Sequence, residues 1–296
     1  MRIEKLNPEF DDLIVSDASI ELIAEGFSFT EGPVWNSKGN YLLFSDIPAN
    51  KIYQWSADKS VEVYRHNSNF SNGLTYDSQG SLIACEHQSR SITREFPGGD
   101  IVTLASLYQE KKLNSPNDVI ASSDGSILFS DPIYGLKAGM GGPADQELPF
   151  QGVYRIKPEA NELELITDSF ERPNGLAFSP DEKTLYIADT VRQHLRAFTV
   201  DDNWHITGGQ IWAKLWDDSA VGRPDGLKVD QNGNVFCVGP GGIWVFNPNA
   251  ELLGRIYLDD KTSNLAWGED SHSLFITCSS KVYRIKCKTA GNIPPN

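Results

Sequence analysis

The sequence predicts an all-β protein, a six-bladed β-propeller built from four-stranded antiparallel blades. Three observations favour this fold: a segment that recurs six times, short runs rich in β-branched and aromatic residues, and a separate strand-like run near the N-terminus. No run shows the pattern of an amphipathic helix. Repeats of roughly 40–50 residues that each hold four short strands are typical of propellers.

The recurring segment defines the blades. Each copy opens with a polar residue, continues as an apolar run, turns at polar residues that often include glycine, and returns as a second apolar run. In the second copy, residues 72–86, this reads NGLTYDSQGSLIACE. A third short strand follows in every copy, and a fourth follows in the first five. The copies begin near residues 31, 72, 117, 174, 225 and 264, which predicts six blades.

The sixth copy lacks a fourth strand, because residues 287–296 are polar and end in Ile-Pro-Pro-Asn. A spare strand lies at the other end of the chain, where Glu21–Phe27 resembles the fourth strand of the third copy, Glu164–Phe170. We therefore expect the N-terminal strand to complete the last blade, since closure pairs backbone groups that an open edge would leave unpaired. Residues 1–296 are then expected to form a single domain, although length alone would suggest about two.

The composition limits the partners. The chain has 26 Lys and Arg against 40 Asp and Glu, a net charge of −14. This argues against nucleic acid or an anionic membrane surface as a partner, and it is compatible with a neutral small molecule or a cation. No apolar run approaches the roughly 18 residues of a membrane span, and no export signal is expected. Four cysteines without metal-binding spacing predict free buried thiols and a reducing, cytoplasmic location, whereas the oligomeric state is left undetermined.

Oxygen-bearing side chains recur at the start of each innermost strand, where a propeller gathers equivalent positions around its axis. Strand two returns antiparallel, so its last residue comes back to the same face. Such a concentration of carboxylate and amide oxygen predicts a hard cation such as Ca²⁺ at this face. The inner ring is Glu31, Asn72, Asn117, Asn174, Asp225 and Asn264, and the outer ring is Asp46, Glu86, Asp131, Asp189, Gly239 and Ser279.

A second interpretation of the inner ring stays open, because Asn-Gly and Asp-Gly are also common in turns. Two observations favour the cation. The hairpin turns are already supplied elsewhere, as at Asn232-Gly, and the ring varies between Glu, Asn and Asp, which turn geometry alone would not require. For the outer ring the simpler interpretation is favoured, that strand-end carboxylates cap nearby backbone or face solvent.

One loop, residues 132–151, has about twenty residues where its counterparts have about five. Long loops in compact domains are often lids or binding loops, so we expect it to fold over the cation face, with a disordered insertion as the alternative. His87 follows the second strand of the second copy and should lie near the same face, either at the rim or in contact with substrate. The sequence contains no Gly-x-Ser-x-Gly, P-loop or His-Glu-x-x-His motif.

Several segments together resemble the gluconolactonase family, which includes senescence marker protein/regucalcin and the luciferin-regenerating enzyme. The resemblance extends from about Phe27 to Ile285 and is closer to the bacterial gluconolactonase branch than to regucalcin. The segments that carry it include FSFTEGPVW (27–35), KLNSPND (112–118), RPNGL (172–176) and RPDGL (223–227).

The resemblance implies one divalent cation inside the propeller, usually Ca²⁺, with Zn²⁺, Mg²⁺ and Mn²⁺ as alternatives. Carried over by motif, Glu31, Asn174 and Asp225 would be the direct ligands. Asn117 would reach the cation directly or through water and would also touch the substrate. The sequence departs from regucalcin at Ser115, where regucalcin has an arginine, so an arginine that grips substrate is not expected here.

The family resemblance also implies a metal-dependent lactonase, a hydrolase that converts a sugar lactone such as glucono-1,5-lactone to the aldonic acid. The cation would polarise the lactone carbonyl, and Asp225 would act as general base. The expected substrate contacts are Asn117, Asn72, His87, Tyr134 and Phe150. Two alternatives stay open: another lactonase or arylesterase activity at the same cation, and a non-catalytic binding propeller that the cation stabilises.

Overall fold

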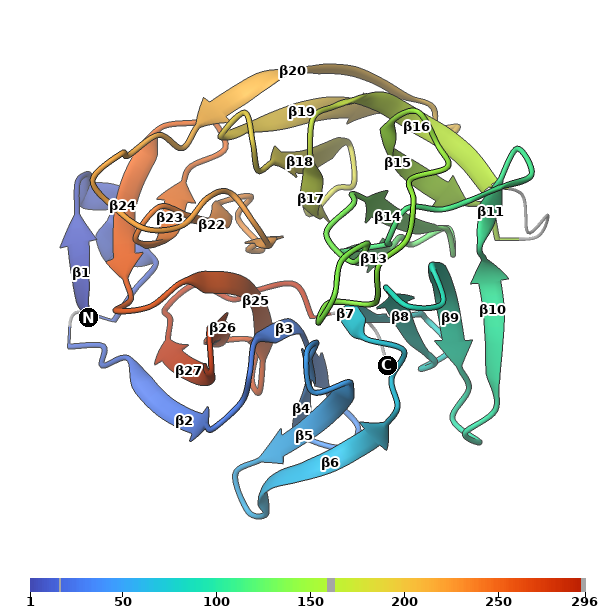
Figure 1. The fold of residues 1–296 in the computed structure, drawn as a ribbon. Coiled ribbons are helices and arrows are strands. Elements are labelled where there is room, and N and C mark those ends of the chain that lie inside the picture. Colours follow the sequence, from blue (N-terminus) through green and yellow to red (C-terminus); the bar gives the residue numbers. More distant parts are fainter. Residues whose placement is uncertain (16, 159–162, 294–296) are drawn as a thin grey trace.

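The computed structural model describes residues 1–15, 17–158 and 163–293. Within these ranges the protein is all-β, and its six main antiparallel sheets stand as blades around a common axis (Figure 1). The predicted six-bladed β-propeller is confirmed. The same residues contain no α-helix, only one short 3-10 helix, Pro8–Asp12 (η1), and none of their helices could span a membrane.

In every blade the first strand of the repeat is innermost, and the inner strands of successive blades contact one another around the whole ring. The strands of blades 1 to 3 are, from the axis outwards, β3 (Thr30–Asn36), β4 (Tyr41–Asp46), β5 (Lys51–Ser56) and β6 (Ser60–His66); β7 (Ser71–Tyr76), β8 (Leu82–Glu86), β9 (Ser91–Glu95) and β10 (Ile101–Ala105); and β13 (Val119–Ala121), β14 (Ile127–Asp131), β15 (Gln151–Ile156) and β16 (Leu163–Phe170).

Blades 4 to 6 follow the same order, and a small hairpin of β11 (Leu107–Tyr108) and β12 (Lys111–Lys112) links blades 2 and 3. The strands of blades 4 to 6 are β17 (Pro173–Phe178), β18 (Thr184–Asp189), β19 (His194–Val200) and β20 (Ile206–Lys214); β21 (Leu227–Val229), β22 (Val235–Gly239), β23 (Gly242–Phe246) and β24 (Leu252–Tyr257); and β25 (Thr262–Gly268), β26 (Ser273–Cys278), β27 (Lys281–Lys286) and β2 (Glu21–Glu25).

The N-terminal strand closes the ring as predicted. Strand β2 pairs antiparallel with β27, with Glu21 opposite Arg284 and Glu25 opposite Lys281. One strand was not expected: β1 (Arg2–Lys5) adds to the outer edge of β24, so blade 5 has five strands. The outer edges of β24 and β27 would otherwise be open, and N-terminal strands cover both of them.

Aromatic and aliphatic side chains fill the space between neighbouring blades, because each strand turns alternate residues toward the next sheet. Trp35 of blade 1 stacks on Phe275 of blade 6, with ring centroids 5.2 Å apart. Trp267 of blade 6 meets Phe236 of blade 5 edge-on at 5.1 Å. These contacts fix the blades relative to one another and so fix the start of each inner strand.

The segment after β27 crosses back beneath the ring instead of adding a strand. Cys287 forms an isolated bridge with Ile14, and Gly291 forms one with Asp230. A side chain at position 291 would lie within 1.8 Å of the Trp267 ring, so only glycine allows the segment to pack there. The predicted absence of a fourth strand in this segment agrees with the structure through residue 293, and residues 294–296 lie outside the described residues.

Candidate functional site

The predicted inner-ring residues lie at equivalent places, at or just before the start of the inner strands. In four blades a β-bulge lies beside the ring residue, as between Glu31 and Val34 in β3 and between Thr262 and Asn264 in β25. Bulges of this kind occur in β7 and β17 as well. A bulge changes the direction of the side chain beside it. This explains how the first residues of an inner strand can point a polar side chain toward the axis.

The glycines that follow the ring residues allow the inner strands to approach one another. A side chain at position 32 would lie 1.9 Å from the Asn72 carbonyl oxygen, and the backbone there has φ of +52°. A side chain at position 226 would lie 2.0 Å from the Asn264 amide oxygen. These Glu-Gly and Asp-Gly pairs therefore serve close packing between blades and are not the tips of hairpins.

One cavity of about 480 Å³, called here the upper cavity, opens at this end of the axis. Its lining includes six of the eight residues that the sequence predicted for the site: Glu31, Asn72, Asn117, Tyr134, Asn174 and Asp225. The sequence did not predict the other lining residues, which are Phe29, Ile47, Lys137, Met140, Thr190, Arg223 and Lys261.

The two carboxylates of the cavity are buried, with Glu31 4% and Asp225 9% exposed. Burial, with a smaller contribution from Asp118, raises the pKa of Glu31 to about 7. Burial and the nearby charge of Glu31 raise the pKa of Asp225 well above its usual value, and a hydrogen bond from Asn174 partly opposes this. Two carboxylates that both resist ionisation leave a strong local demand for positive charge.

The donors present fit a hard cation. The described residues contain no cluster of three or more His, Cys, Asp and Glu side chains that could hold a metal, so two carboxylates must be supplemented by amide oxygens. Asn117 and Asn174 line the same cavity as Glu31 and Asp225. Carboxylate and amide oxygens suit Ca²⁺, whereas Zn²⁺ prefers nitrogen and sulfur ligands.

Asp118 is a buried member of the site that the sequence analysis overlooked. The Asn264 amide Nδ2 donates to Glu31 Oε2 at 3.1 Å and to Asp118 Oδ2 at 3.4 Å, so one amide links the two carboxylates. Burial raises the pKa of Asp118, and Lys228 opposes this. The sequence did contain a signal: Asp118 stands where most copies of the repeat have glycine after the ring residue.

His87 lies behind the upper cavity and is 1% exposed. Its Nδ1 is 2.6 Å from the Met140 carbonyl oxygen and must donate to it, which leaves Nε2 to accept from the Asn72 amide at 3.2 Å. Burial lowers the pKa of His87 to about 4, so the ring is neutral. His87 therefore connects Asn72 to the loop.

The loop between β14 and β15 is anchored at several points. Gly135 donates its N–H to Ser115 Oγ at 2.9 Å. Glu147 pairs with Arg90 at 3.0 Å and accepts the Lys112 N–H at 2.9 Å. Three residues of this loop, Tyr134, Lys137 and Met140, line the upper cavity.

The aromatic residues of this loop have different surroundings. Tyr134 lines the cavity beneath the Arg172 guanidinium, whose carbon lies 5.0 Å from the ring centre. Burial raises the Tyr134 pKa to about 12. Phe150 is not in the cavity lining; its ring packs against Tyr108, with centroids 6.4 Å apart. The site therefore receives Tyr134 directly, while Phe150 supports the loop.

Three of the four outer-ring carboxylates bind backbone groups, whereas Glu86 accepts hydrogen bonds from side chains. Asp46 accepts the N–H groups of Ser28 and Phe29, at 2.9 and 3.1 Å. Asp189 accepts those of Glu171 and Arg172 in the same way. Asp46 and Asp189 hold the segments that enter the inner strands. This agrees with the simpler interpretation, that strand-end carboxylates cap nearby backbone.

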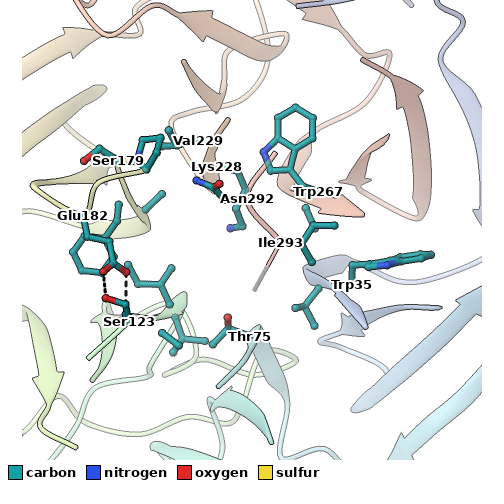
Figure 2. Close-up of a pocket in the computed structure, with 18 of the residues that line it drawn as sticks. Trp35, Thr75, Ser123, Ser179, Glu182, Lys228, Val229, Trp267, Asn292 and Ile293 are labelled. Atoms are coloured by element: carbon teal, nitrogen blue, oxygen red, sulfur yellow. Dashed lines mark hydrogen bonds between the residues drawn. The ribbon is translucent and has the colours of Figure 1, made fainter. Parts of the chain in front are cut away.

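A second cavity, called here the lower cavity, occupies the opposite end of the axis and has a volume of about 490 Å³. Figure 2 shows Trp35, Trp267 and Ile293 on one side of it and the Ser123–Glu182 hydrogen bonds on the other. Lys228 extends into this cavity from β21, which begins two residues after Asp225. Most of the lining is apolar, and Ile293 comes from the C-terminal segment.

Several known proteins are similar to this chain in sequence and fold. Residues 29–280 match the family model described as the SMP-30/Gluconolactonase/LRE-like region. A gluconolactonase of Zymomonas mobilis is 34% identical over 98% of this chain and 87% of that protein. Regucalcin of Bos taurus is 28% identical over 90% and 88%. A gluconolactonase structure from Xanthomonas campestris has a TM-score of 0.90 at 33% identity, covering 97% of this chain and 95% of that one.

Proposed function

The chain belongs to the SMP-30/gluconolactonase/LRE-like family, and on that premise we propose that it hydrolyses a sugar lactone, such as glucono-1,5-lactone, to the aldonic acid. The observation that carries the proposal is the meeting of Glu31 and Asp225 in one buried cavity, although they come from blades 1 and 5. The amides of Asn117 and Asn174 share that cavity.

Glu31, Asn174 and Asp225, with Asn117, would hold one divalent cation, and their oxygen atoms favour Ca²⁺. When bound, the cation supplies positive charge that polarises the lactone carbonyl and offsets the negative charge on its oxygen in the transition state. The demand for positive charge between Glu31 and Asp225 supports this part of the proposal.

Asp225 is the proposed general base. Burial and the charge of Glu31 make its carboxylate a better proton acceptor than an exposed aspartate. It would take a proton from the water that attacks the carbonyl carbon, and the Asn174 amide fixes its orientation. Ring opening then releases the aldonic acid.

The remaining polar groups of the cavity would hold the sugar. Asn72, Asn117 and Tyr134 present amide and hydroxyl groups suited to sugar hydroxyls. His87 accepts one Asn72 N–H and so acts as a positioning residue for that amide. Phe150 contributes through the loop, because its ring packs away from the cavity.

The test is hydrolysis of glucono-1,5-lactone by protein stripped with EDTA and then supplied with Ca²⁺, Mg²⁺, Mn²⁺ or Zn²⁺. We expect a rate above spontaneous hydrolysis that EDTA removes and a divalent cation restores. Aryl esters and non-sugar lactones belong in the same panel, because turnover of these alone would favour another esterase activity. No turnover of any of them, with EDTA still lowering the melting temperature, would favour a binding propeller.

The location is also a proposal. All four cysteines are buried and free of disulfides. Free thiols persist where glutathione keeps proteins reduced, so they support the expected cytoplasmic location.

A further inference from the structure

We propose that the upper cavity selects lactones that carry an anionic group, a phosphate or a carboxylate, away from the lactone carbonyl. The inference deepens the lactonase proposal and rests on it. It begins from three cationic side chains, Lys137, Arg223 and Lys261, that line the same cavity as Glu31 and Asp225.

The three cations come from separate parts of the chain. Lys137 belongs to the loop after β14, Arg223 precedes β21, and Lys261 precedes β25. All three are exposed at the mouth of the cavity. Their convergence on one opening therefore results from the fold and not from a basic stretch of sequence.

None of the three forms an ion pair within the part of the chain that the structure describes. Lys261 instead lies over the Phe29 ring, with Nζ 5.2 Å from the ring centre. Elsewhere the excess of carboxylates pairs readily with cations, as at Arg155 with Asp124 and Arg284 with Glu269. In a chain with 40 acidic and 26 basic residues, three unpaired cations around one cavity are available to a ligand.

The charge of the lining favours an anion. Three cations against the carboxylates of Glu31 and Asp225 give 3 − 2 = +1, and a bound divalent cation would raise this to +3. Asp118 does not line the cavity and is offset by Lys228. A neutral sugar would leave this positive charge unbalanced, whereas a phosphate or carboxylate would balance it.

A simpler role for the cations would be to balance the two buried carboxylates. Lys261 does act in this way, since it lowers the pKa of both Glu31 and Asp225. Lys137 and Arg223 are not among the main groups that shift either carboxyl. Charge balance with the two carboxylates therefore does not account for Lys137 and Arg223. The planar arginine fork suits phosphate and carboxylate oxygens.

A further donor lies behind the lining. The Arg172 guanidinium covers Tyr134, and its Nε is buried without a hydrogen-bond partner among the described residues. Cations around a narrow opening raise the local concentration of anions and their rate of entry, and salt screens this effect. Selection for an anionic substrate should therefore depend on ionic strength.

The experiment uses the cation-loaded full chain and two matched pairs of lactones. One pair is 6-phosphoglucono-1,5-lactone and glucono-1,5-lactone, and the other is glucaro-1,4-lactone and glucono-1,4-lactone. We expect kcat/KM for at least one anionic member to exceed that of its neutral match about tenfold at low salt, with the gap closing near ~0.5 M salt. The pair with the larger gap identifies phosphate or carboxylate as the preferred group.

Charge-removing variants test the three side chains. Lys137→Gln, Arg223→Gln and Lys261→Gln should each lower the anionic-to-neutral ratio of kcat/KM about threefold, and the triple variant should abolish the preference. Lys183→Gln is the control, because it removes the same charge from the loop before β18, beside Asp181 and Glu182 of the lower cavity. It should leave the ratio unchanged.

Calorimetry supplies a readout without turnover. The open-chain product 6-phosphogluconate should bind about tenfold more tightly than gluconate, and the triple variant should lose the difference. Equal affinities together with equal kcat/KM values for matched lactones would overturn the anion proposal while leaving the lactonase proposal intact. No hydrolysis of any lactone would instead overturn the lactonase proposal, and the calorimetric ratio would still decide whether the cavity selects anions.

Discussion

The two ends of the propeller axis hold cavities of nearly equal size, about 480 and 490 Å³, with opposite linings. The upper cavity gathers carboxylates, amides and cations, whereas the lower cavity is lined mainly by apolar side chains. Strand β3 contributes to both, with Glu31 at its start and Trp35 near its end. Strand β25 carries Asn264, which donates to Glu31 behind the upper cavity, and then Trp267 of the lower cavity. Only three or four residues, about 10–13 Å of strand, separate the two environments.

The comparison teaches that chemistry and stability are divided along the axis. Buried carboxylates at the upper end cost free energy, because burial opposes their ionisation. Buried aromatic residues at the lower end, such as Trp267 against Phe236, stabilise the fold. Substitutions at the upper end should therefore change activity, and substitutions at the lower end should change the free energy of unfolding.

The largest effect is expected for Asp225→Asn, which removes the proposed base but keeps the shape of the side chain. The kcat for lactone hydrolysis should fall about 10³-fold. Asp181→Asn, a carboxylate of the lower cavity, is the matched control and should stay within about twofold of the original. If Asp225→Asn keeps its lactonase rate while still binding the cation, the proposed base is wrong.

Trp267→Ala addresses the other end of the axis. Trp267 is 1% exposed, so its loss should lower the free energy of unfolding by about 3–5 kcal/mol in urea titrations. Trp216→Ala, at a tryptophan 60% exposed, should change it by less than about 0.5 kcal/mol. A Trp267→Ala protein with normal stability but lost activity would contradict the division of activity and stability between the two ends of the axis.

The stability of the protein should depend on pH through the buried carboxylates of the upper cavity, and Ca²⁺ should change that dependence. A carboxyl whose folded pKa is raised contributes stability that is present at low pH and lost as the pH rises through that pKa. For Glu31 this window extends from about 4.5 to about 7, so the metal-free protein should lose stability over it. Ca²⁺ competes with protons for the same oxygens and should therefore raise the melting temperature more at pH 8 than at pH 5.5.

The stabilisation of the folded protein by Ca²⁺ follows from linkage. It should be about 2.7 kcal/mol when the cation is present at 100 times its Kd. Glu31→Gln should abolish the Ca²⁺-dependent increase. Part of the pH dependence of the metal-free protein should survive in that variant, since burial also raises the pKa of Asp131, outside the cavity, to about 7. A melting temperature insensitive to Ca²⁺ at pH 8 would argue against the cation site.

A smaller effect is expected for His87→Leu, which removes the bonds to Met140 and Asn72. Losing them should loosen the 132–151 loop and raise KM about three- to tenfold, with kcat nearly unchanged. Limited proteolysis at the exposed Pro143–Glu147 stretch should become faster. A fall in kcat at constant KM would instead indicate that His87 contacts the reacting atoms.

The architecture was largely predictable because each blade repeats the same local pattern. The end of β4 at Asp46 and the pairing of β2 with β27 follow from that repetition. Strand β1 was not predicted, since four residues carry little periodic signal and their partner β24 lies some 250 residues away. The path of the C-terminal segment under Trp267 was also missed, because residues 287–293 have a polar composition that suggests no packing.

The ring positions of the upper cavity could be predicted for the same reason, since Glu31, Asn174 and Asp225 occupy equivalent places in their repeats. Lys137 and Lys261 occupy no repeated position, and Arg223 repeats only Arg172 of the preceding blade. An exposed cation gives no sequence signal of the direction it faces. Phe150 illustrates the opposite problem: an aromatic residue in the right loop can pack away from the cavity. Such orientations depend on tertiary contacts between distant segments.

The seam of the ring determines when during synthesis the protein can become functional. Glu31 of blade 1 accepts a hydrogen bond from Asn264 of blade 6. Strand β2 cannot pair until β27 has been synthesised. A ribosome adding ~5–20 residues per second would finish the last blade on the order of ten seconds or more after Glu31 emerges. Nascent chains would thus hold an incomplete form of the proposed cation site until translation is almost over. Cation affinity would then report whether the first and last blades had met.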